Sequence, residues 1–195
     1  MIEVNRDSLS VFVTAHLREQ IFLRRSYSPG DYIRELDLSA ELGVSRGPIR
    51  DAIKNLAAEG VLVISPWKGA QVTSLTAAER EDIRGLCGVL EDRLAALLRQ
   101  KGAPDAAAAG ELQSLAGEMK RLSGMDSLEA REQLAELEGR FHDRLFQLAG
   151  RPWTEKALRG AYSQRALARL NLSKKAAAEE TAQSCLALLE KIQRP

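Results

Sequence analysis

Three basic side chains follow one another at four-residue steps: Arg46, Arg50 and Lys54. On a helix, this spacing places them in one stripe. Arginine can bridge the acceptor edge of guanine with two hydrogen bonds, and the N-terminus of a helix favours phosphate. Gly47 lets the backbone approach another molecule closely. The pattern predicts a DNA-reading helix, although on an isolated helix a solvated basic face would be the better interpretation.

The neighbouring residues predict two helices joined by a tight turn. The first spans residues 35–42, and Gly43 supplies the positive φ that a helix end commonly needs. Val44 is expected to be buried. Ser45 is the expected N-cap of the second helix, and Pro48 fits its first turn because no N–H is needed there. The second helix has a separate apolar stripe, formed by Ile49, Ala52, Ile53, Leu56 and Ala57.

A β-hairpin is expected directly after this helix. Residues 61–64 and 70–73 are β-prone, and the loop between them is rich in turn formers. Its tip carries Lys68 and Gly69, which could reach phosphates or the minor groove. Trp67 could stack at the tip or anchor the hairpin on the domain. A hairpin in this position is a wing.

Residues 38–60 read Leu-Ser-Ala-Glu-Leu-Gly-Val-Ser-Arg-Gly-Pro-Ile-Arg-Asp-Ala-Ile-Lys-Asn-Leu-Ala-Ala-Glu-Gly. This stretch resembles the winged helix-turn-helix signature of the GntR family of bacterial transcription regulators, with the resemblance extending over residues 9–73. It implies a homodimer that binds a short palindromic double-stranded DNA operator, usually as a repressor released by a small metabolite.

The resemblance also implies DNA contacts at Ser45, Arg46, Gly47, Arg50 and Gly69. We expect Lys54 and Lys68 to add phosphate contacts. Some family members carry a further DNA-reading arginine in the first helix of the motif. Leu36 occupies that position here, and neighbouring Arg34 is the candidate to substitute for it.

Composition places the chain among ordinary globular proteins. It has 195 residues, 45% of them hydrophobic, and a net charge of +1. Acidic and basic residues balance in residues 1–75, so the DNA prediction depends on where the bases fall. We expect a cytoplasmic protein without a membrane span or signal sequence. Cys87 and Cys185 lie in apolar helical stripes and are expected to be reduced core thiols.

The predicted fold is mainly α. A helix over residues 7–25, with Leu9, Phe12, Val13, Leu17 and Ile21 inward, opens a winged helix-turn-helix domain of three helices and a β-hairpin, residues 1–74. Residues 75–195 predict a second domain, an antiparallel all-α bundle. The family resemblance implies that this helical domain binds the effector and holds the dimer together. Thr76 and Glu79 form a capping box at its start. Its five helices are expected near residues 76–102, 105–123, 127–149, 152–172 and 175–193.

A helical bundle behind such a winged helix resembles the FCD branch of the family. The resemblance implies a divalent metal, zinc or similar, held by one Asp and three His, with an effector carboxylate completing the shell. Glu138 and His142 match the first half of that motif, with Glu for Asp. No histidine follows His142, and the segment after it is short for the branch. Water, Gln164 or Glu180 could complete a site, but an ordinary Glu–His pair is the favoured interpretation.

Other features of the second domain leave its role open. Cys87 replaces an arginine that often lines the FCD pocket, so the domain either binds a different ligand or mainly holds the dimer together. Lys156, Arg159, Arg165 and Arg169 are favoured as a solvated face over an acidic-effector site. His16 is expected to pack or lie at the surface. A metal-dependent enzyme using Glu138 and His142, and a winged helix that contacts only proteins, are the remote alternatives to a non-enzymatic regulator.

Overall fold

The computed structural model describes residues 6–65, 68–102 and 104–193, which form two compact units. The first comprises the chain up to Glu79 together with Ala166–Asn171. The second comprises Arg80–Arg165 and the chain from Leu172 onwards.

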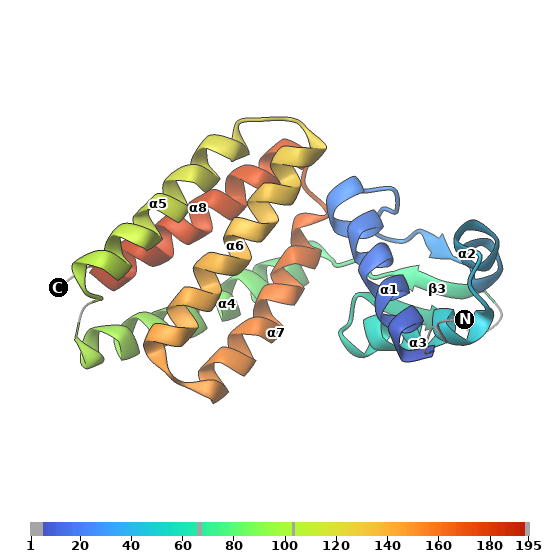
Figure 1. Ribbon diagram of the computed structural model, residues 1–195, viewed down its shortest axis with the longest axis horizontal. Coiled ribbons are helices and arrows are strands. Elements are labelled where there is room, and N and C mark those ends of the chain that lie inside the picture. Colours follow the sequence, from blue (N-terminus) through green and yellow to red (C-terminus); the bar gives the residue numbers. More distant parts are fainter. Residues whose placement is uncertain (1–5, 66–67, 103, 194–195) are drawn as a thin grey trace, which may run out of the picture. The chain divides into compact units, whose positions relative to one another are not determined.

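The first unit contains the predicted winged helix-turn-helix (Figure 1). The expected opening helix is an α-helix that continues as a short π-helix and ends at Arg25, whose φ is 57°. The elements are α1 (Arg6–Arg18), the π-helix η1 (Glu19–Arg24), β1 (Tyr32–Ile33), α2 (Glu35–Leu42), α3 (Arg46–Ala58), β2 (Leu62–Ser65) and β3 (Gly69–Val72).

The hairpin of β2 and β3 belongs to a three-stranded antiparallel sheet with the order β1-β3-β2. In β1, Tyr32 lies opposite Gln71 and Ile33 lies opposite Ala70. Strand β1 was not predicted from the sequence. Two residues are too few to show the alternation of a strand, and their pairing depends on a partner 37 or more positions away.

The core of the first unit is built mainly from α1, α3 and the sheet. Val13, Leu17 and Ile21 pack with the apolar stripe of α3, and Val44 is buried as predicted. The prediction that Phe12 is buried was wrong, because Phe12 is 53% exposed. The buried residues of α1 and η1 lie on the side of the helix that carries Val13. Phe12 is the preceding residue and therefore points about 100° away from that side.

The second unit consists mainly of the five predicted helices, whose bounds lie within three residues of the expected ones. They are α4 (Ala77–Lys101), α5 (Ala106–Ser123), α6 (Leu128–Ala149), α7 (Pro152–Arg169) and α8 (Lys174–Gln193). The caps explain these bounds. Side chains of Asp105 and Ser127 accept hydrogen bonds from Ala108 N and Ala130 N, and Gly150 ends α6 with a φ of 60°. The predicted capping box before α4 is also present, with Glu79 N donating to Thr76 Oγ1 over 3.2 Å.

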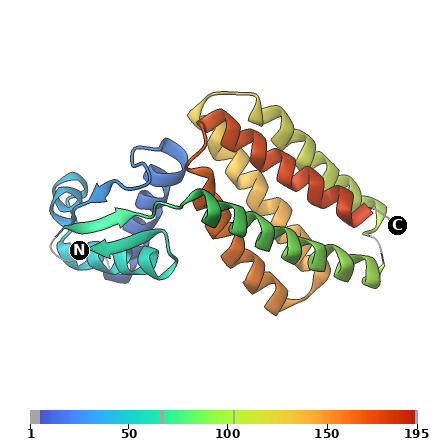
Figure 2. The same ribbon diagram turned by 180° about the vertical axis from the view of Figure 1, so that it is seen from behind.

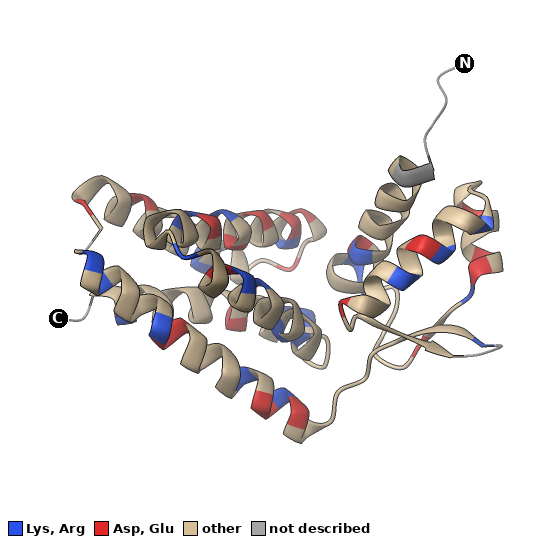
Figure 3. Ribbon diagram, turned by 90° about the horizontal axis from the view of Figure 1, so that it is seen from below, with Lys and Arg blue, Asp and Glu red and all other residues tan. Residues whose placement is uncertain are grey.

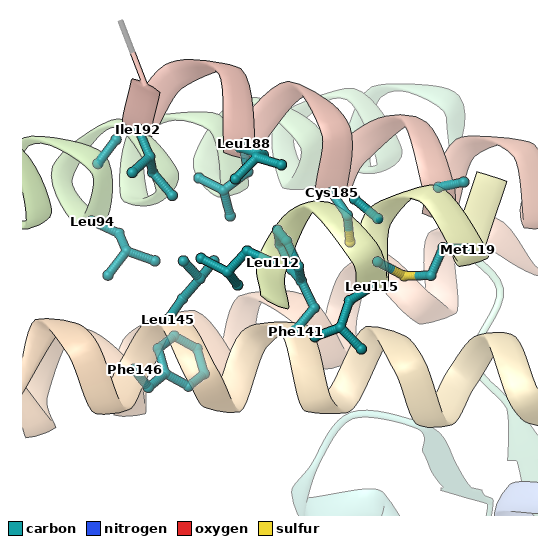
Figure 4. Close-up of a cluster of buried hydrophobic side chains, with 14 of the residues drawn as sticks. Leu94, Leu112, Leu115, Met119, Phe141, Leu145, Phe146, Cys185, Leu188 and Ile192 are labelled. Carbon is teal, nitrogen blue, oxygen red and sulfur yellow. The ribbon is translucent and has the colours of Figure 1, made fainter. Parts of the chain in front are cut away.

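Helices α5, α6 and α8 enclose most of the core of this unit (Figure 4), and side chains from α4 and α7 complete it. The chain is mainly α-helical, as predicted. Figure 2 shows α4 from the other side. Helix α4 is joined to α7 by the Glu91–Arg165 ion pair and to α8 by the Asp92–Lys191 ion pair.

Candidate nucleic-acid interface

Helix α3 has two distinct faces. Ile49, Ala52, Ile53 and Leu56 are buried in the core of the first unit, whereas Arg46, Arg50 and Lys54 are exposed. The apolar contacts fix the helix, because rotating it would bring charged side chains into the core. The basic stripe therefore points to solvent.

A groove of about 890 Å³ runs beside this stripe. Helices α2 and α3 and all three strands contribute to its lining. It brings together six of the eight residues expected to contact DNA: Arg34, Arg46, Arg50, Lys54, Lys68 and Gly69. Five are cationic, and they come from three segments of the chain: the start of α2, helix α3 and the wing. Basic and acidic residues are interspersed along the ribbons (Figure 3), so this groove is distinguished by its local arrangement of charge.

The other two predicted residues lie at the start of α3. Ser45 is exposed at the N-cap position, as predicted, and Gly47 is half-buried in the first turn. The expected capping hydrogen bond, in which the Ser45 hydroxyl accepts from a backbone N–H, is not formed. A capping side chain commonly accepts from the third N–H of the helix, and Pro48 occupies that position without an N–H. Ser39 instead donates to the carbonyl of Val44 over 2.8 Å and secures the turn.

Gly69 is required by the backbone itself. Its φ is 97°, and a Cβ at this position would lie 2.6 Å from the carbonyl oxygen of Ile33 in β1. The wing can therefore pack against β1 only with glycine here. The wing-tip residue Trp67, which the sequence left open as stacking or anchoring, lies outside the described residues.

Arg50 does not stand alone in the groove. Its Nε donates to Oε2 of Glu35 over 2.7 Å, which joins α3 to the first turn of α2. This bond holds the guanidinium through its inner nitrogen and does not use the two terminal ones. Sequence reasoning missed Glu35, because the two residues are 15 positions apart and no helical spacing links them.

Leu36 and Arg34 are both exposed and line the groove. Arg34 is the N-cap residue of α2, with extended backbone angles. The structure thus places an arginine next to the position where some family members carry one, and an apolar side chain at the position itself.

The second unit gathers a different set of polar residues. One potential ligand atom from each of Glu138, His142 and Cys185 lies within 4.8 Å of the others. A carboxylate, an imidazole and a thiolate form a donor set that suits zinc or a similar divalent metal. Cys185 was predicted to be only a core thiol. It is fully buried, but its place beside the Glu–His pair depends on how α8 packs on α6.

Aromatic and charged groups surround this cluster. Tyr162 stacks on His142 with ring centroids 4.1 Å apart, and the guanidinium carbon of Arg165 lies over the tyrosine ring, 4.4 Å from its centroid. Burial raises the pKa of the Tyr162 hydroxyl far above its ordinary value, and the negative charge of Glu91 adds to the effect. The phenol therefore stays neutral at any physiological pH.

The predicted solvated face of α7 was only half right. Lys156 and Arg159 are exposed, but Arg165 and Arg169 are about 5–6% exposed. Arg165 donates to Glu91 over 2.6 Å, and Glu91 is buried as well. Four-residue spacing cannot separate a solvated stripe from one that a partner helix covers. Because Glu91 already neutralises Arg165, this arginine is poorly suited to receive an acidic ligand.

Residues 9–72 match the family model of the bacterial regulatory proteins of the gntR family. A transcriptional regulator from Streptomyces ambofaciens is 31% identical over 149 residues, which is 75% of this chain and 60% of that protein. YdhC from Bacillus subtilis is 39% identical over 67 residues, 34% of this chain and 30% of its own length. The chain thus spans less than two thirds of these relatives, which are described as transcriptional regulators and not as enzymes.

Two solved structures share the fold. Escherichia coli McbR/YncC has a TM-score of 0.64 and 19% identity, with 94% of each chain covered. A putative GntR regulator from Rhodococcus sp. RHA1 has a TM-score of 0.60 and 20% identity, covering 94% of this chain and 92% of that one. In the described part of the protein, no helix is long and apolar enough to cross a membrane. The fold and the family match together identify residues 9–72 as a winged helix-turn-helix of the bacterial gntR family.

Proposed function

We propose that the protein is a transcriptional regulator that binds a specific double-stranded DNA sequence. The observation that carries this proposal is the groove in which five cationic side chains from α2, α3 and the wing converge. A polyanion is the natural partner of such a surface, and an exposed recognition helix fits the major groove of DNA.

Each residue of the interface has a proposed role. Arg46 and Arg50 contact base edges, and Arg34 adds a contact from the start of α2. Lys54 and Lys68 bind phosphate. The start of α3 approaches the backbone of the duplex at Ser45 and Gly47, where its free N–H groups and dipole favour phosphate. Gly69 shapes the wing so that its tip can enter the adjacent groove.

The proposed functional form is a cytoplasmic homodimer that represses transcription from a palindromic operator. Two copies would place their α3 helices in successive major grooves. We assign DNA binding to residues 1–74, and dimerisation and effector binding to residues 75–195 in the manner of the FCD branch. A small carboxylate is the proposed effector, and a bundle that has lost its response to ligand is the alternative.

Selection of bound sequences from random duplex DNA tests this function. We expect one enriched sequence with two inverted half-sites. Arg50→Ala should cost about 1–3 kcal/mol of binding free energy at one base position of each half-site and relax specificity there. Arg121→Ala is the matched control, because Arg121 is an exposed arginine of α5 outside the groove. Binding of all sequences alike, with a steep salt dependence, would contradict direct readout.

A divalent metal in the second unit is a second proposal, supported by the position of Cys185 beside Glu138 and His142. The three side chains would hold zinc and leave one position for water or the effector carboxylate. Zinc retained after dialysis, measured by elemental analysis, should approach one per chain and be lost in His142→Gln and Cys185→Ser. Cys87→Ser, which alters the other buried thiol, should retain it. Purified protein that holds no zinc when offered it at micromolar concentration would leave an ordinary Glu–His pair.

A further inference from the structure

Helix α4 carries an exposed stripe of four residues: Asp82, Leu86, Val89 and Arg93. Their steps of four, three and four place them in a band about 60° wide on one side of the helix. Leu86 is 54% exposed and Val89 is 67% exposed. Apolar side chains at this spacing, adjacent on a long helix and open to solvent, are typical of a helix–helix contact.

The two ends of this α4 stripe carry opposite charges. Asp82 and Arg93 are exposed, and neither forms a hydrogen bond or ion pair with any residue that the structure describes. They are separated by eleven positions, or about 16 Å along the helix. Other charges of α4 are paired within the chain, such as Arg84 with Glu81 and Asp92 with Lys191. The two unpaired charges are those that flank the apolar pair.

This arrangement is self-complementary. If a second α4 crosses the first in the antiparallel direction around a two-fold axis between positions 86 and 89, Leu86 faces Val89 of the other copy. Asp82 then faces Arg93 of the other copy, and both contacts occur twice. A parallel alignment would instead bring each charge beside its own kind.

The surface next to the stripe favours close approach. Gly85 precedes Leu86 on α4. Apart from its chain neighbours and its own helix backbone, no atom of the described residues lies within 4 Å of where its Cβ would be. On the other flank, an apolar groove of about 530 Å³ is lined by side chains that include Ile83, Leu86, Ala157 and Trp153, which is 79% exposed. The apolar surface thus extends beyond α4 to α7, which enlarges the area that a partner can bury.

We propose that the α4 stripe is the face on which two copies of this chain dimerise, in the antiparallel register set by Asp82 and Arg93. The proposal rests on the homodimer proposed above and names its contact. A second copy is favoured over an unrelated partner because the charge pattern complements itself.

Charge reversal tests the register. Asp82→Arg and Arg93→Asp each place like charges opposite one another at both ends of the contact, and each should weaken dimerisation by about tenfold or more. The double variant restores both opposite-charge pairs and should regain most of the affinity. An equimolar mixture of the two single variants should form heterodimers. Sedimentation equilibrium measures all four samples, and Glu132→Arg, an exposed reversal on α6, is the matched control.

The outcomes distinguish a failure of the proposed dimer contact from a failure of the proposed DNA-binding function. Single variants that dimerise like the wild type, or a double variant weaker than both, would overturn the proposed register. A wild-type dimer that responds as expected but selects no DNA sequence would leave the α4 face standing and remove the proposed function. A monomeric wild type, or binding of another protein without self-association, would overturn the proposal that a second copy binds the α4 stripe.

Discussion

The cations of α3 in the first unit and the Glu91–Arg165 pair in the second unit differ in their exposure to solvent. In the first, Arg46, Arg50 and Lys54 are exposed on a helix whose other face is fully apolar. In the second, Arg165 and Glu91 are buried and paired with each other. An exposed cation can exchange water for an external phosphate at little cost, whereas a buried pair is already committed. The exposed cations of α3 are therefore open to an external partner, and the buried pair contributes to how the bundle packs.

The largest effect should come from breaking the buried pair. Glu91→Ala leaves the Arg165 cation buried without its carboxylate, and we expect a loss of about 3–5 kcal/mol in the free energy of unfolding. Urea titration followed by circular dichroism measures it. The double variant Glu91→Leu/Arg165→Met removes both charges and should recover most of the loss. If Glu91→Ala unfolds at the wild-type urea concentration, the pair does not behave as a buried one.

Two glycines of the first unit, Gly69 and Gly43, allow the backbone requirement of the fold to be tested without changing any charge. Gly69→Ala places an added Cβ at a left-handed φ and against the Ile33 carbonyl. We expect it to lower the free energy of unfolding by about 2–5 kcal/mol. Gly43→Ala has a positive φ but open space around the added Cβ, so we expect only about 1–2 kcal/mol. Thermal unfolding of the two variants compares them. Equal losses would show that the wing yields to the added methyl group.

Glu35→Gln sharpens the comparison within the interface. The Arg50–Glu35 pair is largely exposed, so its loss should change the free energy of unfolding by less than about 1 kcal/mol. Base discrimination at the position read by Arg50 should fall, but by less than the about 1–3 kcal/mol expected for Arg50→Ala. Competition binding with operator variants measures the base discrimination of Glu35→Gln and of Arg50→Ala. Discrimination identical to the wild type would mean that Glu35 does not orient the guanidinium.

The smallest effect is expected at the wing. Lys68→Ala removes one proposed phosphate contact and should weaken binding about equally for all sequences. The slope of log K against log salt concentration should become shallower by about 1. Fluorescence anisotropy at several salt concentrations measures the slope. An altered sequence preference would instead assign Lys68 to base readout.

Patterns within one element were predictable from the sequence. The helix bounds followed from caps and glycines, and the two faces of α3 followed from its period, because both depend on residues a few positions apart. The same local reasoning failed for Ser45, where Pro48 removes the N–H that the hydroxyl commonly binds. That failure was readable from the sequence, since both residues lie in the same turn.

Contacts between elements were not predictable in this way. Strand β1 pairs with β3, Glu35 reaches Arg50, Cys185 lies beside Glu138 and His142, and Glu91 neutralises Arg165. Each of these contacts joins residues 15 to 74 positions apart. The spacing of residues within one element does not predict which other element it packs against.

By itself, the sequence determined the main helices, the β-hairpin, the family resemblance and the stripe of cations on one helix. Those features depend on local spacing and on the cost of burying charge. The tertiary structure decided which charges stay open to a partner. A basic stripe becomes a recognition surface or half of a buried ion pair according to whether another helix packs over it, and that is settled by the packing of the whole chain.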